Sequence, residues 1–132
     1  MTMKIPQGAM IVVANGGAAR VFTNVGEAGT LALRQEALLE GMNLDDDGPA
    51  GAMPAESSAS QLDEATFAKQ LALGLNEGAL KNKFTDLVLI ADPHTLGRVR
   101  PLLHKETTQR LVADLAKDYT NLPLDAIERA LS

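Results

Sequence analysis

The sequence predicts one α/β domain, residues 1–132, built on a mixed five-stranded sheet with the strand order 3-2-1-4-5. Three observations lead to this prediction. The first third of the chain alternates β-branched runs with Asn and Gly turns, as an antiparallel meander does. Two helical patterns then alternate with two further strand patterns, and such crossovers return strands parallel to the first. A length of 132 residues and an apolar content of 45% fit a single globular domain.

The meander comes first in the chain. Its three strands are expected at residues 10–14, 18–25 and 30–38. Asn15-Gly16 between the first two apolar runs predicts a hairpin, because both central residues of its tight turn need a positive φ. Gly26 and Gly29 indicate a second tight turn. In the third strand Leu31 and Leu33 share one face of the sheet.

A change of composition follows the meander. Residues 41–61 are rich in Gly, Pro, Ala, Ser and Asp and show no periodicity, so we expect a flexible loop here. Ser60 and Asp63 then fit the capping box that opens a helix. This helix carries an apolar stripe at helical spacing, which we expect to be buried: Phe67, Leu71 and Leu75.

The remaining strands and helices alternate. A fourth strand is expected at residues 86–91. After Asp86 its residues are all apolar, which is typical of a strand covered on both faces. Residues 95–103 predict a short helix that Pro101 shortens. A fifth strand is expected at 110–115, and a last helix at 124–131 after Pro123. With strands 4 and 5 parallel to strand 1, this is a ribonuclease-H-like arrangement.

The composition excludes several classes of protein. The net charge of −5 and the aromatic content of 3% argue against a general nucleic-acid binder with an aromatic stacking platform. The absence of cysteine excludes disulfides, thiolate nucleophiles and zinc-thiolate sites. Neither a transmembrane run nor a signal peptide is recognisable, so we expect a cytoplasmic protein without a membrane partner.

Three segments together resemble a known family. They are Ile11–Phe22 (IVVANGGAARVF), Leu87–Arg100 (LVLIADPHTLGRVR) and Lys117–Pro123 (KDYTNLP). In this order they resemble the bacterial host-attachment proteins, a family that is itself similar to the middle domain of eukaryotic and archaeal peptide-chain release factors. The resemblance implies a ribonuclease-H-like, release-factor-like domain and, as partners, the ribosome or tRNA.

The chain departs from this resemblance at two places. The first strand in the family commonly ends in Asp-Gly, whereas this one ends in Asn15-Gly16. Release factors carry Gly-Gly-Gln between the third strand and the first helix. Here Gln61 follows Ser60 with no Gly-Gly before it. Hydrolysis of peptidyl-tRNA by that motif is therefore not expected, although Gln61 stays a candidate RNA contact.

Candidate catalytic and metal-binding residues are few. A two-metal nuclease needs several carboxylates, and the first strand supplies none. Asp92, at the end of the fourth strand, is either one such ligand or the cap of the following helix. His94 is either a proton carrier or a surface histidine. Asp45-Asp46-Asp47 does not fit the calcium-loop pattern. We expect neither a metal nor a cofactor.

One basic cluster runs against the overall negative charge: Arg98, Arg100, Lys105 and Arg110. These residues either contact RNA or keep a helix and a loop solvated. The leading hypothesis is a non-enzymatic binding protein that contacts the ribosome or tRNA. The second is a protein-interaction factor with an indirect role in attachment to host cells, and the third a hydrolase that uses Asp92 and His94. A homodimer through the third strand, at the sheet edge, is a further expectation.

Overall fold

The computed structural model describes residues 5–27, 30–40 and 59–131, with the backbone alone for 40 and 59–63. The strands are β1 (Met10–Ala14), β2 (Ala18–Asn24), β3 (Leu33–Glu40), β4 (Leu87–Ala91) and β5 (Leu111–Ala116). The helices are α2 (Ala59–Leu80), α3 (Pro93–Val99), the 3-10 turn η2 (Arg100–Leu102), α4 (Lys105–Arg110) and α5 (Leu124–Leu131).

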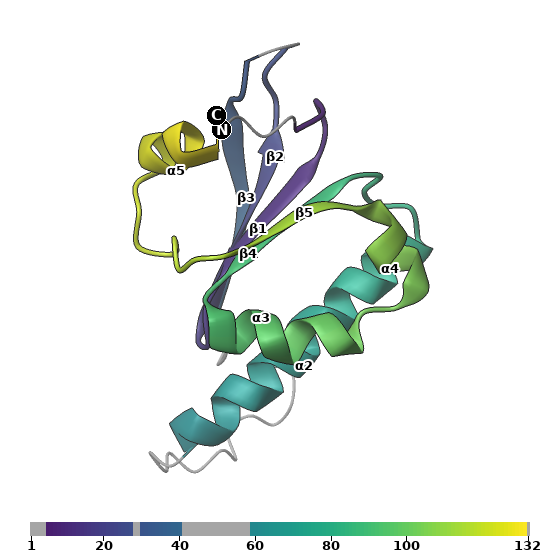
Figure 1. Cartoon of the computed structure of the whole chain (residues 1–132), viewed down its shortest axis with the longest axis vertical. Helices are drawn as coiled ribbons and strands as arrows, with labels where there is room; N and C mark the ends of the chain where they lie inside the picture. Colours follow the sequence, from purple (N-terminus) through teal and green to yellow (C-terminus); the bar gives the residue numbers. More distant parts are fainter. Residues whose placement is uncertain (1–4, 28–29, 41–58, 132) are drawn as a thin grey trace.

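The five strands form one mixed sheet in the order β3-β2-β1-β4-β5 (Figure 1). β1 pairs antiparallel with β2, and β2 antiparallel with β3. β4 pairs parallel with β1 and with β5. The predicted α/β fold, the strand order and the ribonuclease-H-like arrangement are therefore confirmed, and the last helix has the predicted bounds.

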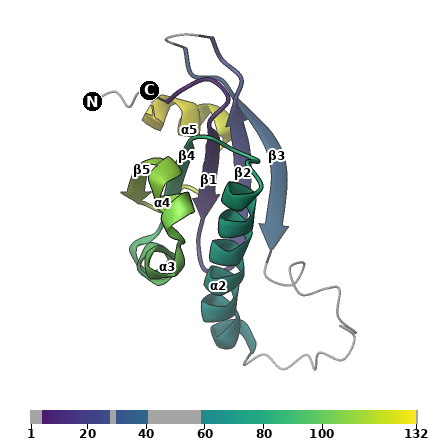
Figure 2. The same cartoon turned by 90° about the vertical axis from the view of Figure 1, so that its right-hand side faces the viewer.

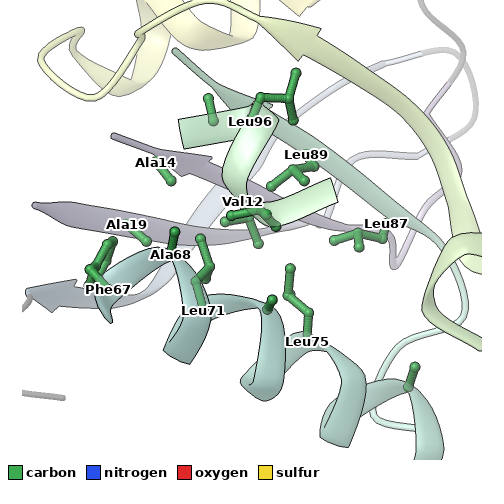
Figure 3. Packing of buried hydrophobic residues seen from close by; sticks show 14 of the residues in the cluster. Val12, Ala14, Ala19, Phe67, Ala68, Leu71, Leu75, Leu87, Leu89 and Leu96 are labelled. Carbon is green, nitrogen blue, oxygen red and sulfur yellow. The ribbon is translucent and has the colours of Figure 1, made fainter. Parts of the chain in front are cut away.

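Helices cover both faces of the sheet, α2 and α3 on one face and α5 on the other (Figures 1 and 2). Alternate residues of β1 and β4 therefore enter two separate cores. Figure 3 shows Leu71 and Leu75 of α2 turned toward Val12 of the sheet, with Phe67 beside Ala19. All residues of β4 are buried, as the uninterrupted apolar run predicts.

The third strand begins three residues later than predicted, at Leu33 instead of residue 30. The cause is Asn24, a buried residue at the end of β2. Its Oδ1 accepts the N–H groups of Gly26 at 3.0 Å and Ala32 at 3.2 Å, so the connection closes around this amide. Leu31 and Leu33 nevertheless pack on the same core, as the alternation predicts.

The segment between β4 and β5 holds two helices where one was predicted over 95–103. α3 ends at Val99, because Pro101 enforces the turn η2 instead of a further α-helical turn. α4 was not predicted. Asn76 of α2 holds this segment, because its Nδ2 donates to Leu102 O at 3.0 Å and its Oδ1 accepts from His104 N at 2.7 Å.

The first helix begins at Ala59, so Ser60 lies inside the helix. The prediction that Ser60 is the N-cap is therefore wrong. The predicted loop 41–61 is therefore shorter at its end, and residues 41–58 lie outside the described part of the chain. No helix within the described residues has both the length and the apolar character that crossing a bilayer requires.

Candidate functional site

The site lies at the carboxyl ends of three neighbouring parallel strands. Ala14 of β1 pairs with Ala91 of β4, and Ala91 pairs with Ala116 of β5. The residues that follow each strand therefore meet at one edge of the sheet. Open α/β sheets bind ligands at this edge, outside the carboxyl ends of the strands.

The hairpin after β1 is confirmed, but the predicted reason for it is wrong. Among the described residues other than glycine only Asn82 has a positive φ, and among the described glycines only Gly8. The turn is instead closed by the Asn15 side chain, whose Oδ1 accepts the N–H groups of Gly17 at 2.8 Å and Ala18 at 2.9 Å. This Asx turn needs an oxygen acceptor at residue 15 and no left-handed backbone.

The same side chain reaches the connection between β5 and α5. Asn15 Nδ2 donates to Thr120 Oγ1 at 2.9 Å, and the Thr120 hydroxyl donates in turn to Asp118. An amide can donate and accept at once, which a carboxylate cannot. Asn15 thus joins two segments at the sheet edge.

Arg20 of β2 also binds the connection between β5 and α5. Its guanidinium donates to Thr120 O at 3.1 Å and to Leu122 O at 2.6 Å, and its Nε donates to Gln35 Oε1 at 3.1 Å. The guanidinium carbon also lies 5.1 Å from the centre of the Phe22 ring. These contacts already occupy Arg20, so its role here is structural.

Asp92 acts as the helix cap that was one of its two predicted roles. Its Oδ2 accepts from Thr95 N at 3.2 Å at the start of α3, while its Oδ1 is buried and has no hydrogen-bond partner among the described residues. His94 is exposed, and no hydrogen bond joins it to Asp92. Across the described residues no three side chains of His, Cys, Asp or Glu converge as metal ligands would.

The predicted basic residues divide into two groups. Arg98 pairs with Glu64 of α2 at 3.4 Å, and Arg100 with Asp114 of β5 at 3.5 Å. The Arg98 and Arg100 side chains are 42% and 59% exposed, and Lys105 is exposed with no ion pair to any described residue. Ion pairs of this exposed kind contribute about 0–1 kcal/mol, so a stronger anion can replace the carboxylates.

Arg110 belongs to the second group. Its side chain is only 20% exposed, and it donates to Phe84 O at 2.8 Å and to Asn82 Oδ1 at 3.0 Å. It thus holds the turn that follows α2. Gln61 lies in the first turns of α2, and its side chain is outside the described residues.

Comparison with known proteins identifies the family. A family model described as "Bacterial archaeo-eukaryotic release factor family 12" matches residues 8–131. The chain belongs to this family. The resemblance to release factors is therefore confirmed. The match does not support the narrower assignment to the host-attachment proteins. No curated protein matches the chain.

Among solved structures, this release-factor family member is similar to the type II variant of the Aquifex aeolicus Ppx/GppA phosphatase. The sequence identity is 16% and the TM-score 0.39, and the match covers 81% of this chain. The chain spans 34% of the length of that phosphatase.

Sequence reasoning missed the residues that join the edge together: Asn15, Glu64, Asp118 and Thr120. From the sequence alone, Asn15 indicates only a turn residue and a departure from aspartate. The Lys117–Pro123 segment was noted only as part of the resemblance. The Asn15–Thr120 contact joins residues 105 positions apart and the Glu64–Arg98 contact joins residues 34 apart, and no local pattern reports such contacts.

Proposed function

We propose that this protein is a non-enzymatic binding domain that contacts the ribosome or tRNA. The observation that carries the proposal is membership of the release-factor family over residues 8–131. The proposal names a binding domain because Gln61 is preceded by Ala59-Ser60 and not by Gly-Gly. It follows that contact with RNA is expected without hydrolysis of peptidyl-tRNA.

Arg98, Arg100 and Lys105 are the proposed RNA contacts, and Gln61 is added to them on the strength of the resemblance alone. The three basic residues lie in α3, η2 and the first turn of α4, in the segment between β4 and β5, and all are exposed. Because the ion pairs of Arg98 and Arg100 are long and exposed, exchanging a carboxylate for a phosphate costs little. Arg110 is left out of the proposal, because Phe84, Asn82 and Glu106 already engage it.

Co-sedimentation of the purified protein with ribosomes and with tRNA, at low and near-physiological salt, tests the proposal. Phosphate contacts make affinity fall with salt, so saturable binding that survives near-physiological salt is the expected result. The double variant R98E/R100E should lower the affinity by about tenfold or more, since each reversal replaces an attraction by a repulsion.

The matched control is R34E/R129E. It reverses two arginines that are also exposed and also paired with a carboxylate, Arg34 with Glu36 and Arg129 with Asp125. An equal loss in both double variants would mean that net charge alone drives binding. No binding at either salt would remove the proposed function and leave protein interaction as the expectation.

A further inference from the structure

Three elements bring a glycine, a carboxylate and a guanidinium together beside the β1–β2 turn. Gly16 follows β1, Glu64 lies on α2 and Arg98 lies on α3. A Cβ atom added at Gly16 would lie 2.9 Å from Glu64 Cγ and 3.2 Å from Glu64 Oε2. The other oxygen of the same carboxylate, Oε1, lies 3.4 Å from Arg98 Nη1. Glu64 thus lies between the turn and the arginine.

The groups around this carboxylate are ones that bind anions. Arg98 makes no other ion pair or hydrogen bond with a described residue. The backbone N–H of Gly16 takes part in none of the hydrogen bonds found in the described part of the chain, unlike those of Gly17 and Ala18. A free backbone N–H and a guanidinium are both strong donors toward phosphate oxygens.

The Glu64 carboxylate is held only weakly by Arg98. The Glu64 and Arg98 side chains are 56% and 42% exposed, and pairs so exposed contribute about 0–1 kcal/mol. A phosphate group, like a carboxylate, accepts two parallel hydrogen bonds from a guanidinium, so it can take the place of a carboxylate that is held this weakly.

We propose that the Gly16 N–H and Arg98 form a phosphate subsite, in which Glu64 engages Arg98 alone until a phosphate group displaces the carboxylate and binds both donors. The assignment of that phosphate to an RNA backbone rests on the proposed function. No glycine of the described residues has its Cβ position against the Arg100–Asp114 pair, so that pair is not such a subsite. Glu64 therefore lowers the affinity of the unliganded domain for RNA and makes binding selective for phosphate that reaches the turn.

The test compares E64Q, E64Q/R98Q and R98Q with the wild-type protein in tRNA and ribosome binding at one fixed salt concentration. E64Q keeps the shape of the side chain and removes its charge. We expect E64Q to raise the affinity about threefold or more, and R98Q to cancel that gain, so that E64Q/R98Q binds like R98Q. E77Q is the matched control, since Glu77 is an exposed acid of the same helix that pairs with Lys81 at 2.8 Å. Equal gains in E64Q and E77Q would overturn the subsite.

A second measurement separates the subsite from the proposed function. Inorganic phosphate is titrated into each variant while the backbone amide resonance of Gly16 is followed, with sodium chloride at equal ionic strength as the reference. Phosphate should shift that resonance in E64Q more than in wild type, and not in E64Q/R98Q. If phosphate shifts Gly16 as expected while no variant binds RNA, the subsite stands and the proposed function fails. If phosphate leaves Gly16 unmoved in E64Q, the subsite is wrong whether or not the protein binds ribosomes.

Discussion

Asn15 Nδ2 donates a hydrogen bond to Thr120 Oγ1 at 2.9 Å, across 105 positions of the chain. The Thr120 hydroxyl proton is directed to Asp118, so toward Asn15 this hydroxyl can only accept. The link therefore has a direction, from amide to hydroxyl to carboxylate. It joins the turn after β1 to the connection after β5 at the edge where the candidate site lies.

Replacing Asn15 by aspartate isolates this donor. The N15D variant keeps the oxygen that accepts from Gly17 and Ala18, but it places a carboxylate against a hydroxyl whose proton Asp118 already takes. We expect the free energy of unfolding at pH 7 to fall by about 1–3 kcal/mol, measured by urea denaturation. N121D is the control, because Asn121 is exposed and one position from Thr120. Equal stability of N15D and N121D would mean that the link contributes nothing.

Arg20 gives a second test of the same edge. Lysine in the R20K variant keeps the charge but can reach one of the carbonyl oxygens of Thr120 and Leu122 where the guanidinium reaches both. We expect a loss of about 1–2 kcal/mol in the free energy of unfolding, together with faster amide hydrogen exchange in residues 117–123. R34K provides the comparison, since the Arg34 side chain is 65% exposed and Glu36 is its one ion-pair partner among the described residues. Unchanged exchange in R20K would show that Arg20 does not hold the connection.

The sheet could be predicted because its signals are local. The apolar β-branched run of β1 and the uninterrupted run of β4 report burial by composition alone, and Pro123 marks the start of α5. The hairpin was predicted correctly from Asn15-Gly16 for a wrong reason. The same two residues support a positive-φ turn or an Asx turn, and only the structure distinguishes them.

The missed features depend on long-range contacts. α4 forms where Asn76, on another helix, binds Leu102 and His104. A signal for this existed: Asn76 lies between Ala72 and Ala79 on the buried side of α2, where a polar residue must find partners. The Glu64–Arg98 pair had no such signal, because both residues are exposed and solvated surface charges look alike in sequence.

Asn76 is 4% exposed, and every polar atom of its side chain is used. Its Nδ2 faces Leu102 O, while its Oδ1 accepts from His104 N and from Thr107 Oγ1 at 2.7 Å. The N76D variant would bury a carboxylate oxygen against a carbonyl oxygen, and we expect a loss of about 3–5 kcal/mol at pH 7. The folded state then favours the protonated form, which raises the pKa of the introduced carboxyl, so stability should recover as the pH falls through that pKa. Urea denaturation at pH 7 and pH 5 measures both effects, and an equal loss at both values would contradict this account.

Two glycines of α2 make a matched pair for the packing of the helix. A Cβ atom at Gly74 would meet nothing within 4 Å, whereas one at Gly78 would lie 2.9 Å from Cε2 of the buried Phe84 ring. G74A should therefore raise the free energy of unfolding by about 0.5–1 kcal/mol through helix propensity and loss of unfolded-state entropy. G78A gains the same propensity but must displace a core ring, which costs about 1–3 kcal/mol, so we expect it to be neutral or destabilised.

Thermal and urea unfolding of the two alanine variants beside wild type decide between these expectations. The difference between G74A and G78A is the informative quantity, because propensity cancels and only the contact with Phe84 remains. The double variant G78A/F84L adds a second check. Leucine removes the ring atoms nearest to the new methyl group, so alanine at position 78 should cost less in that background than in wild type. Equal stability of G74A and G78A would mean that the Phe84 ring moves aside freely, and that the end of α2 packs less tightly than the 2.9 Å approach implies.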